Sequence, residues 1–308
     1  MYLKQLLFVL LFFTTTFGHS QIAHYNQYPT KTPLRTVALM EGILDGKTAN
    51  ISVALSMRKL RKKYAGPLVR LRRIVDDKER NFYPKDAALV IDKNKITQWA
   101  AGSELRIVIW YDQSGLERNA VQYTPIKQPL FKFKGSQAYW KGDGIDDHLE
   151  IASSIQQMTN NGKNGTVICV LYATSKSQHT FGVLVDHNRW STHINWSDQN
   201  LYFDPGQCCN NNIRSTNNSN NTNHWSQYTL IRTDSNVIIR VKATEKLNDS
   251  HTFGPCTLNL NFTLGWANGN QAYNHSTTSF SEFIMYKTGI DTTTYKAIED
   301  NQINYWQL

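Results

Sequence analysis

Short strand-like runs recur along most of the chain, and many of them alternate apolar with polar residues. In Thr257–Leu264, for example, Leu258, Leu260 and Phe262 alternate with polar neighbours. A period of two puts the apolar side chains on one face, so such a run predicts a strand with one packed and one wet face. Short strands separated by turn-rich segments are typical of an antiparallel two-sheet sandwich. The predicted strands are Leu68–Arg72, Leu105–Trp110, Phe131–Phe133, Thr166–Ala173, Phe181–Val185, Asn200–Phe203, Gln227–Arg232, Val237–Val241, Thr257–Leu264 and Phe280–Tyr286.

Two segments have the spacing of helices instead. Asn50–Lys63 is predicted to be a helix because Asn50 can cap it, apolar residues follow, and Gly66 with Pro67 ends it. Thr292–Trp306 is predicted to be a closing helix because its large apolar residues lie near helical spacing. The fold class predicted is therefore an all-β sandwich with a short N-terminal helix and a C-terminal helix.

The first twenty residues have the composition of a signal peptide. Lys4 is followed by the apolar run Leu6–Phe13, and Gly18 and Ser20 precede a predicted cleavage before Gln21. No later run reaches the length of a membrane-spanning helix, so we expect a secreted protein without a transmembrane segment. Residues 21–45 are predicted to be an irregular lead-in and residues 46–308 a single domain.

Composition and charge exclude several classes of protein. Hydrophobic residues make up 40% of the 308 and charged residues 19%, which excludes a disordered chain and a membrane bundle. The formal net charge is +9, but Arg58–Arg73 alone holds eight basic residues and no acidic one. The excess is local, so we expect no nucleic-acid partner. The stretch is interpreted as a solvated helix face followed by a strand; the alternative is a docking site for an acidic glycan or anionic surface.

Four cysteines remain after the predicted signal peptide: Cys169, Cys208, Cys209 and Cys256. An even number in an exported protein indicates disulfides, with three possible pairings. The sequence neighbours Cys208 and Cys209 either bond to each other as a rigid apolar knuckle, pair with distant cysteines, or stay reduced. No spacing typical of a structural zinc site is present.

Two motifs resemble the catalytic domain of α-L-arabinofuranosidase B. The first is Ser56–Arg73, with its Tyr-Ala-Gly-Pro turn and basic strand, and the second is Ile107–Gly115, which ends in Tyr-Asp-Gln-Ser-Gly. Together they cover residues 46–128. The remainder, 129–308, resembles secreted laminin-G-like proteins, through Trp140–Leu149 and His193–Asp204. Both resemblances imply a concanavalin-A-like jelly roll.

The resemblance also implies two positions for catalytic carboxyl groups, and neither position holds a carboxyl group in this sequence. The nucleophilic Glu of that family falls at Gln199, and the segment matching the family's acid, Leu264–Asn270, has no carboxylate. An amide neither donates a proton as an acid nor attacks as a carboxylate. Asp198 and Asp204 are the remaining catalytic candidates, although a turn or strand role is the simpler interpretation.

Binding a sugar asks for less than hydrolysis: an aromatic surface and a few fixed polar groups. The family has a vicinal disulfide against the sugar, so Cys208–Cys209 is included, although here it follows the Tyr-Phe strand rather than preceding it. The predicted carbohydrate-binding residues are Trp190, Trp196, Asp198, Tyr202, Cys208, Cys209, Asn210 and Trp266, with Arg214 as a further hydrogen-bonding candidate.

Asp143, Asp146 and Asp147 either form a tight turn or bind Ca²⁺, since hard cations prefer clustered oxygens. Apart from this ion we expect no cofactor. The function predicted is recognition of a polysaccharide or other glycan. The alternatives are a divergent glycosidase acting on α-L-arabinofuranosides and a laminin-G-like adhesion module.

Overall fold

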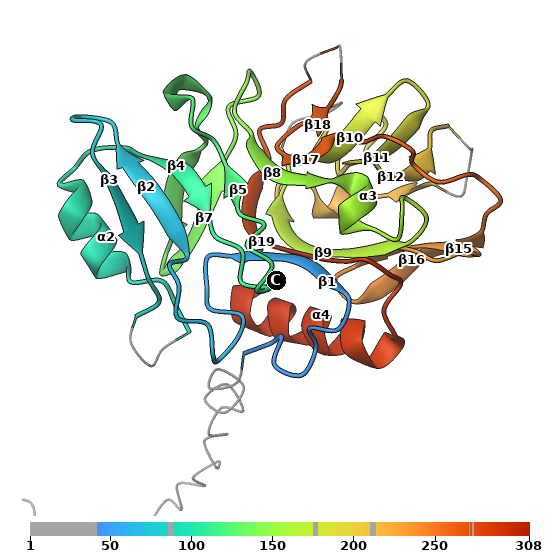
Figure 1. The fold of residues 1–308 in the computed structure, drawn as a ribbon, viewed down its shortest axis with the longest axis horizontal. Coiled ribbons are helices and arrows are strands. Elements are labelled where there is room, and N and C mark those ends of the chain that lie inside the picture. The colour runs from blue at the N-terminus through green and yellow to red at the C-terminus, as the bar shows by residue number, and fades with distance from the viewer. Residues whose placement is uncertain (1–41, 86–88, 175–177, 210–213, 271, 273) are drawn as a thin grey trace, which may run out of the picture. The chain divides into compact units, whose positions relative to one another are not determined.

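The computed structural model describes residues 42–308, except 86–88, 175–177, 210–213, 271 and 273 (Figure 1). The predicted signal peptide and nearly all of the predicted lead-in lie outside these residues. The described residues belong to one compact unit. Within them, no helix combines the length and the apolar character that crossing a membrane requires.

Six antiparallel strands form the first layer of a sandwich, and each is hydrogen-bonded to the next. Nearly every residue of its inner strands is buried, because the layer is covered on both sides. In spatial order the strands are β1 (Ile51–Ser56), β19 (Ser279–Tyr286), β9 (Gly165–Tyr172), β14 (Trp225–Arg232), β15 (Asn236–Val241) and β16 (Thr244–Ser250).

The second layer is also antiparallel and lies opposite the first (Figure 1). A short strand, β18 (Ala267–Asn268), runs parallel to β10 beside it. In spatial order the others are β13 (Ser215–Asn217), β12 (Asn200–Gln207), β11 (Asn188–His193), β10 (Phe181–Val185), β17 (Asn261–Leu264), β8 (Leu149–Ser154) and β5 (Ala120–Val121).

A third group of strands continues the sheet toward the left of Figure 1. It meets the first layer where β7 pairs with β19, and the second layer where β4 pairs with β5. Helix α2 (Lys93–Ala100) packs on it through Ile96. Its strands are β3 (Glu79–Phe82), β2 (Val69–Arg73), β4 (Leu105–Trp110), β6 (Leu130–Lys134) and β7 (Gln137–Lys141).

Aromatic side chains from the two layers meet in the space between them. The ring of Phe283 in β19 lies 5.2 Å from that of Phe181 in β10 and 5.9 Å from that of Phe262 in β17. All three are fully buried, so they form the centre of the core. This arrangement confirms the predicted all-β sandwich.

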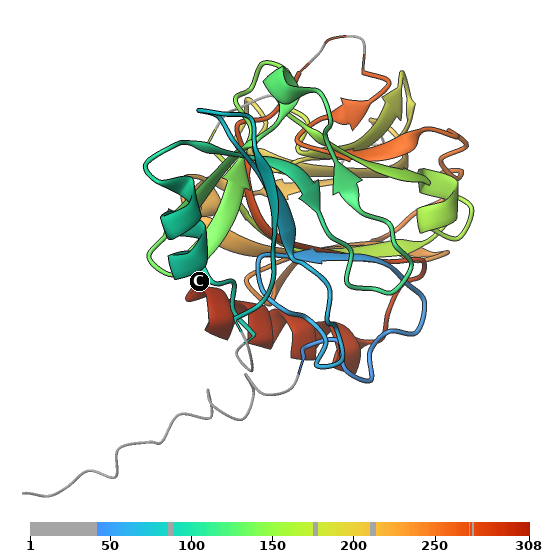
Figure 2. The ribbon, with the colours of Figure 1, turned by 60° about the vertical axis from the view of Figure 1, so that its left-hand side comes forward.

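Helix α4 (Thr292–Trp306) covers the outer face of the first layer, below β1 in Figures 1 and 2. Its Tyr295 and Ile298 pack against a second cluster that includes Ile168 of β9 and Ile284 of β19. The Asp291 side chain accepts a hydrogen bond from the Thr294 backbone and caps the helix. The predicted C-terminal helix is confirmed. Helix α2 and a short helix, α3 (Ile155–Met158), were not predicted.

The predicted N-terminal helix is wrong: Ile51–Ser56 is strand β1. Instead of capping a helix, Asn50 adopts a left-handed backbone conformation. Ala54 and Leu55 point to opposite sides of the strand, one into the cluster under α4 and the other into the main core. A strand buried on both faces has no polar–apolar alternation, so its pattern resembles that of a buried helix.

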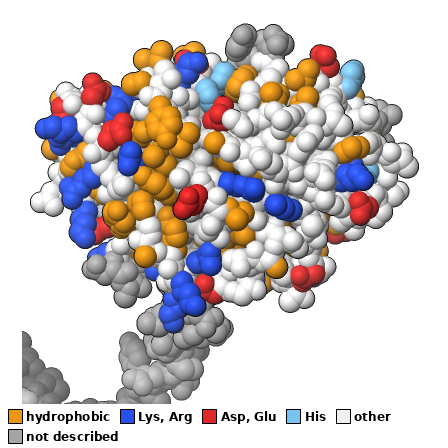
Figure 3. Space-filling view, viewed as in Figure 1, with side chains coloured by type: hydrophobic (Ala, Val, Ile, Leu, Met, Phe, Trp, Pro, Cys, Tyr) orange, Lys and Arg blue, Asp and Glu red, His pale blue; other side chains and the backbone are white. Residues whose placement is uncertain are grey.

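The basic stretch contains no helix: the chain runs irregularly from residue 57 to β2, so the predicted helix face is wrong and the predicted strand is confirmed. Arg58 is buried against Glu282, Arg72 bonds Gln128 and Asp77, and Arg73 bonds Asp76. Figure 3 shows basic and acidic side chains interspersed over the left-hand part, where β2, β3 and α2 lie. Most of the local excess of arginine therefore serves internal contacts.

Candidate functional site

A hollow of about 390 Å³ opens beside strands β10, β11 and β12 of the second layer. We call it the Cys208–Cys209 hollow. Its described lining contains the disulfide, two aromatic rings, two histidines, two arginines and residues of the 270–274 segment: His179, Leu184, Arg189, His193, Trp196, Tyr202, Cys208, Cys209, Arg214, Asn270, Ala272 and Asn274.

Cys208 and Cys209 are bonded to each other, with their Cα atoms 3.7 Å apart. This decides among the pairings that the sequence left open, because Cys169 and Cys256 are free and buried. The bonded pair follows β12 directly, and Cys209 is exposed with a left-handed backbone. A sulfur-rich, weakly polar wall is thereby held rigidly at the edge of the hollow.

Two aromatic rings stand on the same hollow. Trp196 and Tyr202 are partly exposed, and their ring centroids are 6.4 Å apart in an edge-to-face arrangement. The Tyr202 hydroxyl donates a 2.6 Å hydrogen bond to Oδ2 of Asp198. Burial acts to raise the pKa of Asp198, but the hydrogen bonds from Tyr202 and Asn200 lower it overall. Asp198 is therefore an ionised, exposed side chain that orients a ring at the rim.

Asp204 lies behind the hollow and holds its arginines. Its carboxylate is fully buried and accepts two hydrogen bonds from Arg214, while Nη1 of Arg189 lies 3.8 Å from Oδ2. The Arg214 guanidinium also stacks over the Tyr202 ring, 4.5 Å from its centroid. Burial raises the pKa of Asp204, although the two arginines act to lower it. Its role here is to position the guanidinium groups of the two arginines.

His179 and His193 form a buried pair at the inner wall, with ring centroids 4.0 Å apart. Burial lowers the pKa of both rings, to about 4 for His193, and the nearby arginines lower it further. Nδ1 of His193 lies 3.0 Å from the Gln178 carbonyl oxygen, which fixes that nitrogen as the donor of a neutral ring. At neutral pH both rings are uncharged polar groups.

The structure brings together only some of the predicted binding residues. Trp190 is fully buried against Phe203, so its predicted role as a sugar platform is wrong. Trp266 is partly exposed but stacks on His275, outside the lining of the hollow. Asn210 lies outside the described residues. Trp196, Tyr202 and the two cysteines line the hollow, and Asp198 contacts it through Tyr202.

Sequence reasoning missed His179, Arg189 and His193. The signal for His193 was present, because the β11–β12 hairpin pairs it with Tyr202. Nothing in the sequence pointed to His179 and Arg189, because their positions beside the hollow depend on how β10 and β11 pair with each other.

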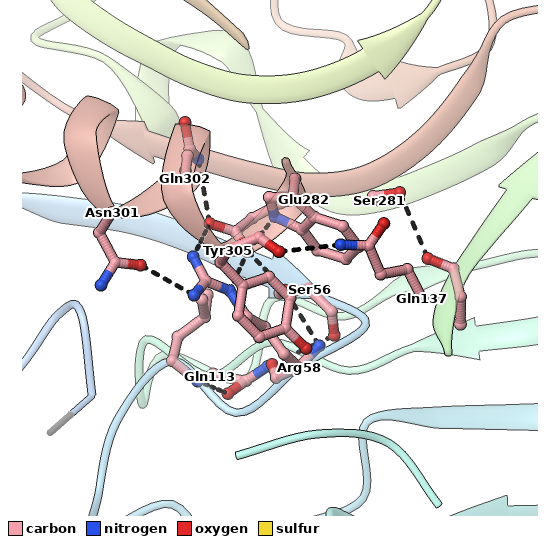
Figure 4. A network of polar contacts seen from close by, with 12 residues as sticks. Ser56, Arg58, Gln113, Gln137, Ser281, Glu282, Asn301, Gln302 and Tyr305 are labelled. Carbon is pink, nitrogen blue, oxygen red and sulfur yellow. Dashed lines mark hydrogen bonds and ion pairs between the residues drawn. The ribbon is translucent and has the colours of Figure 1, made fainter. Parts of the chain in front are cut away.

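Neither catalytic candidate is arranged for hydrolysis. Asp204 is enclosed by arginines and Asp198 is bound to Tyr202 and Asn200. Among the described residues, no Asp or Glu lines the hollow. Glu282, another acid of the strands, belongs to a buried network with Arg58 and Gln302 (Figure 4).

Asp143, Asp146 and Asp147 lie together in the turn between β7 and β8. Each offers one carboxylate oxygen, and the three oxygens lie within 4.8 Å of one another. Asp143 Oδ1 accepts three backbone hydrogen bonds, as a turn-forming Asp does. Asp147 is buried, and its Oδ1 receives no hydrogen bond. Burial, with its acidic neighbours, raises the pKa of Asp147 to about 7.

Comparison with solved structures finds arabinofuranosidases with a similar fold. An arabinofuranosidase complexed with arabinofuranosyl-α-1,2-xylobiose has a TM-score of 0.65 at 15% identity. An α-L-arabinofuranosidase soaked with a cyclic sulfate inhibitor has a TM-score of 0.65 at 16% identity. Each alignment covers 84% of this chain and 64% of the solved one, so the chain spans less than two thirds of their length.

At this identity the likeness shows an all-β fold in common with glycoside hydrolases. No known protein family matches the sequence. No curated protein matches it either.

Proposed function

We propose that this chain is a secreted carbohydrate-recognition protein with a concanavalin-A-like jelly roll, and that the Cys208–Cys209 hollow receives the saccharide. One observation carries the proposal: the vicinal disulfide, Trp196 and Tyr202 line the same hollow, while its described lining has no acid. The fold shared with arabinofuranosidases is consistent with a carbohydrate ligand but does not specify one.

The chemistry of the walls suits a sugar ring. A saccharide has apolar C–H faces and polar hydroxyl edges, so it needs flat, weakly polar walls with a few fixed hydrogen-bonding groups. Trp196, Tyr202 and the disulfide supply the walls, and His193 and Asn274 are among the polar groups. The hydrogen bond from Tyr202 to Asp198 holds one wall in place before any ligand arrives.

Hydrolysis requires more than this site offers. Glycosidases place two carboxyl groups across the bond, about 5–5.5 Å apart for retention or about 6.5–9.5 Å for inversion. Asp204 is buried and its carboxylate is in contact with the guanidinium groups of Arg189 and Arg214, so it is not positioned to transfer a proton to a ligand. We therefore favour binding without turnover.

The test uses the chain without its predicted signal peptide, titrated calorimetrically with plant and algal polysaccharides. We expect at least one polysaccharide to bind, and we expect no release of nitrophenol from 4-nitrophenyl α-L-arabinofuranoside. Release that is abolished by Asp198→Asn or Asp204→Asn would establish the glycosidase instead. Failure to bind any glycan, together with capture of a specific protein partner, would favour the laminin-G-like adhesion module.

A further inference from the structure

The Cys208–Cys209 hollow has an uneven distribution of charge. Two guanidinium groups, of Arg189 and Arg214, belong to its lining, and no described acidic side chain does. The arginine side chains are only 14% and 17% exposed, so water screens their charges less than those of surface arginines.

Asp204 balances only one of the two arginines. It is bidentate with Arg214, whereas its distance to Arg189 Nη1 is 3.8 Å. Arg189 directs Nε and Nη2 to the backbone carbonyl of Asp186, which is a neutral acceptor. The nearby carboxylates of Asp186 and Asp198 are exposed, so water reduces their influence.

The other polar groups of the hollow add no negative charge. His179 and His193 are neutral at neutral pH, because burial and the arginines lower the pKa of each ring. Asn270 and Asn274 are amides. The hollow thus combines a disulfide and aromatic walls with an excess of about one positive charge.

We propose that the ligand is an anionic saccharide, whose carboxylate or sulfate group is bound by Arg189 and Arg214. This inference rests on the proposed glycan-binding function and names the class of ligand. Asp204 accepts from Nε and Nη2 of Arg214, and the Asp186 carbonyl accepts from Nε and Nη2 of Arg189, so the Nη1 groups of the two arginines are the donors for the oxyanion. Such charge-assisted hydrogen bonds are stronger than those between neutral groups. Asp204 contributes indirectly, by holding the Arg214 guanidinium at a fixed angle over Tyr202.

The experiment compares pairs of polysaccharides that share a backbone, one member acidic and the other neutral. One pair is polygalacturonate and its fully methyl-esterified form; the other is dextran sulfate and dextran. We expect the acidic member of at least one pair to bind about tenfold or more tightly than its neutral partner, and its affinity to fall as NaCl is raised. Which pair shows the difference distinguishes a uronate from a sulfate ester.

Substitutions in the lining test whether the anion binds in the hollow. Arg189→Gln is expected to weaken binding of the acidic polysaccharide about tenfold. Arg214→Gln leaves buried Asp204 without its partner, so the paired variant Arg214→Gln/Asp204→Asn is the informative one, because it removes both charges at once. Lys296→Gln, at an exposed position of α4, removes one positive charge elsewhere and is the matched control.

The outcomes separate this inference from the proposed function. Equal binding of acidic and neutral members overturns the ligand class and leaves glycan binding intact. Loss of affinity in Lys296→Gln equal to that in Arg189→Gln shows a general charge effect and overturns the site. Absence of binding to every glycan, neutral or acidic, overturns the proposed function itself. A thermal melt of each variant confirms that it is folded.

Discussion

Arg58 and Glu282 form a buried ion pair across 224 sequence positions, with Nε 2.7 Å from Oε2. The Glu282 carboxylate also accepts hydrogen bonds from Ser56 and Gln302 (Figure 4). The Trp306 indole donates a further one. Burial acts to raise the pKa of Glu282, but Arg58 and the other donors lower it overall. The pair ties the end of β1 to β19 and to α4.

Glu282→Gln is expected to destabilise the protein by about 3 kcal/mol or more, because it leaves the Arg58 charge buried without a counter-ion. Urea denaturation measures the loss. The control is Glu79→Gln, since Glu79 lies 3.9 Å from Arg70 with both side chains more than a third exposed. It should cost under about 1 kcal/mol. Similar losses in the two variants would contradict the central role of the pair.

Ten of the nineteen described strands were predicted from the sequence, whereas β1 was predicted as a helix and eight others, such as β3 and β8, were not predicted. Leu105–Trp110 and Phe181–Val185 have the predicted bounds because clear turn signals flank them. Thr257–Leu264 alternates throughout, yet only Asn261–Leu264 is a strand, because the earlier residues lack a strand partner. The alternation of apolar and polar residues shows which face of a strand is apolar. It does not show whether a neighbouring strand is present to pair with it.

Trp196→Ala is expected to weaken saccharide binding about five- to tenfold, since it removes an aromatic wall of the hollow. The matched variant Trp266→Ala removes a partly exposed indole outside the lining and should leave affinity within about twofold. Calorimetric titration with the tightest polysaccharide measures both. If Trp266→Ala is the more damaging of the two, the saccharide binds elsewhere.

The double variant Cys208→Ser/Cys209→Ser is expected to bind the saccharide several-fold more weakly while its melting temperature changes by under about 3 °C. A bond between sequence neighbours closes almost no loop, so it restricts the unfolded chain little. We expect the disulfide to act on binding instead, by fixing the shape of the hollow's wall. A large fall in melting temperature with unchanged affinity would assign the disulfide to stability alone.

Stability is expected to fall as the pH drops from about 6.5 toward 4. The unfolded chain protonates its histidines near pH 6.5, whereas burial lowers the pKa of His193 in the folded protein to about 4. Between these values the unfolded state binds more protons, so stability is retained above pH 6.5 and lost below it. One such group contributes about 3 kcal/mol.

His193→Asn tests this assignment, because its side-chain amide can still donate to the Gln178 carbonyl. The free energy of unfolding, measured by urea at several pH values, should depend less steeply on pH in this variant. Exposed His224→Asn is the control and should keep the steeper dependence of the unmodified protein. An unchanged slope in His193→Asn would mean that other groups dominate acid unfolding.

The calcium site predicted at Asp143, Asp146 and Asp147 is tested by melting the protein in EDTA and in millimolar Ca²⁺. Two oxygens bound to one Ca²⁺ at about 2.4 Å are at most about 4.8 Å apart, and the three carboxylate oxygens lie within 4.8 Å of one another, which is compact enough to bind one ion. We expect Ca²⁺ to raise the melting temperature by about 4 °C or more. The shift should vanish in Asp147→Asn and persist in Asp300→Asn on α4; no shift in the unmodified protein would refute the site.

The candidate site was only partly predictable. Trp196, Tyr202 and the two cysteines were identified because they lie close together in sequence around β12. Trp190 lies in the same stretch, but its side chain points to the core face of β11, where Phe203 meets it. Which face of a strand is buried depends on the layer it packs against, and the residue types alone did not reveal it.

The pairing of β1 with β19 under α4 also has a consequence for how the chain matures. Ile51 and Ala54 share one buried cluster with Ile284 and Ile298, so the earliest described strand is completed only by a strand and a helix that lie far along the chain. Contacts so distant in sequence make folding slow. During synthesis β1 therefore has no partner until β19 and α4 have emerged from the ribosome, and until then its apolar residues are exposed to aggregation.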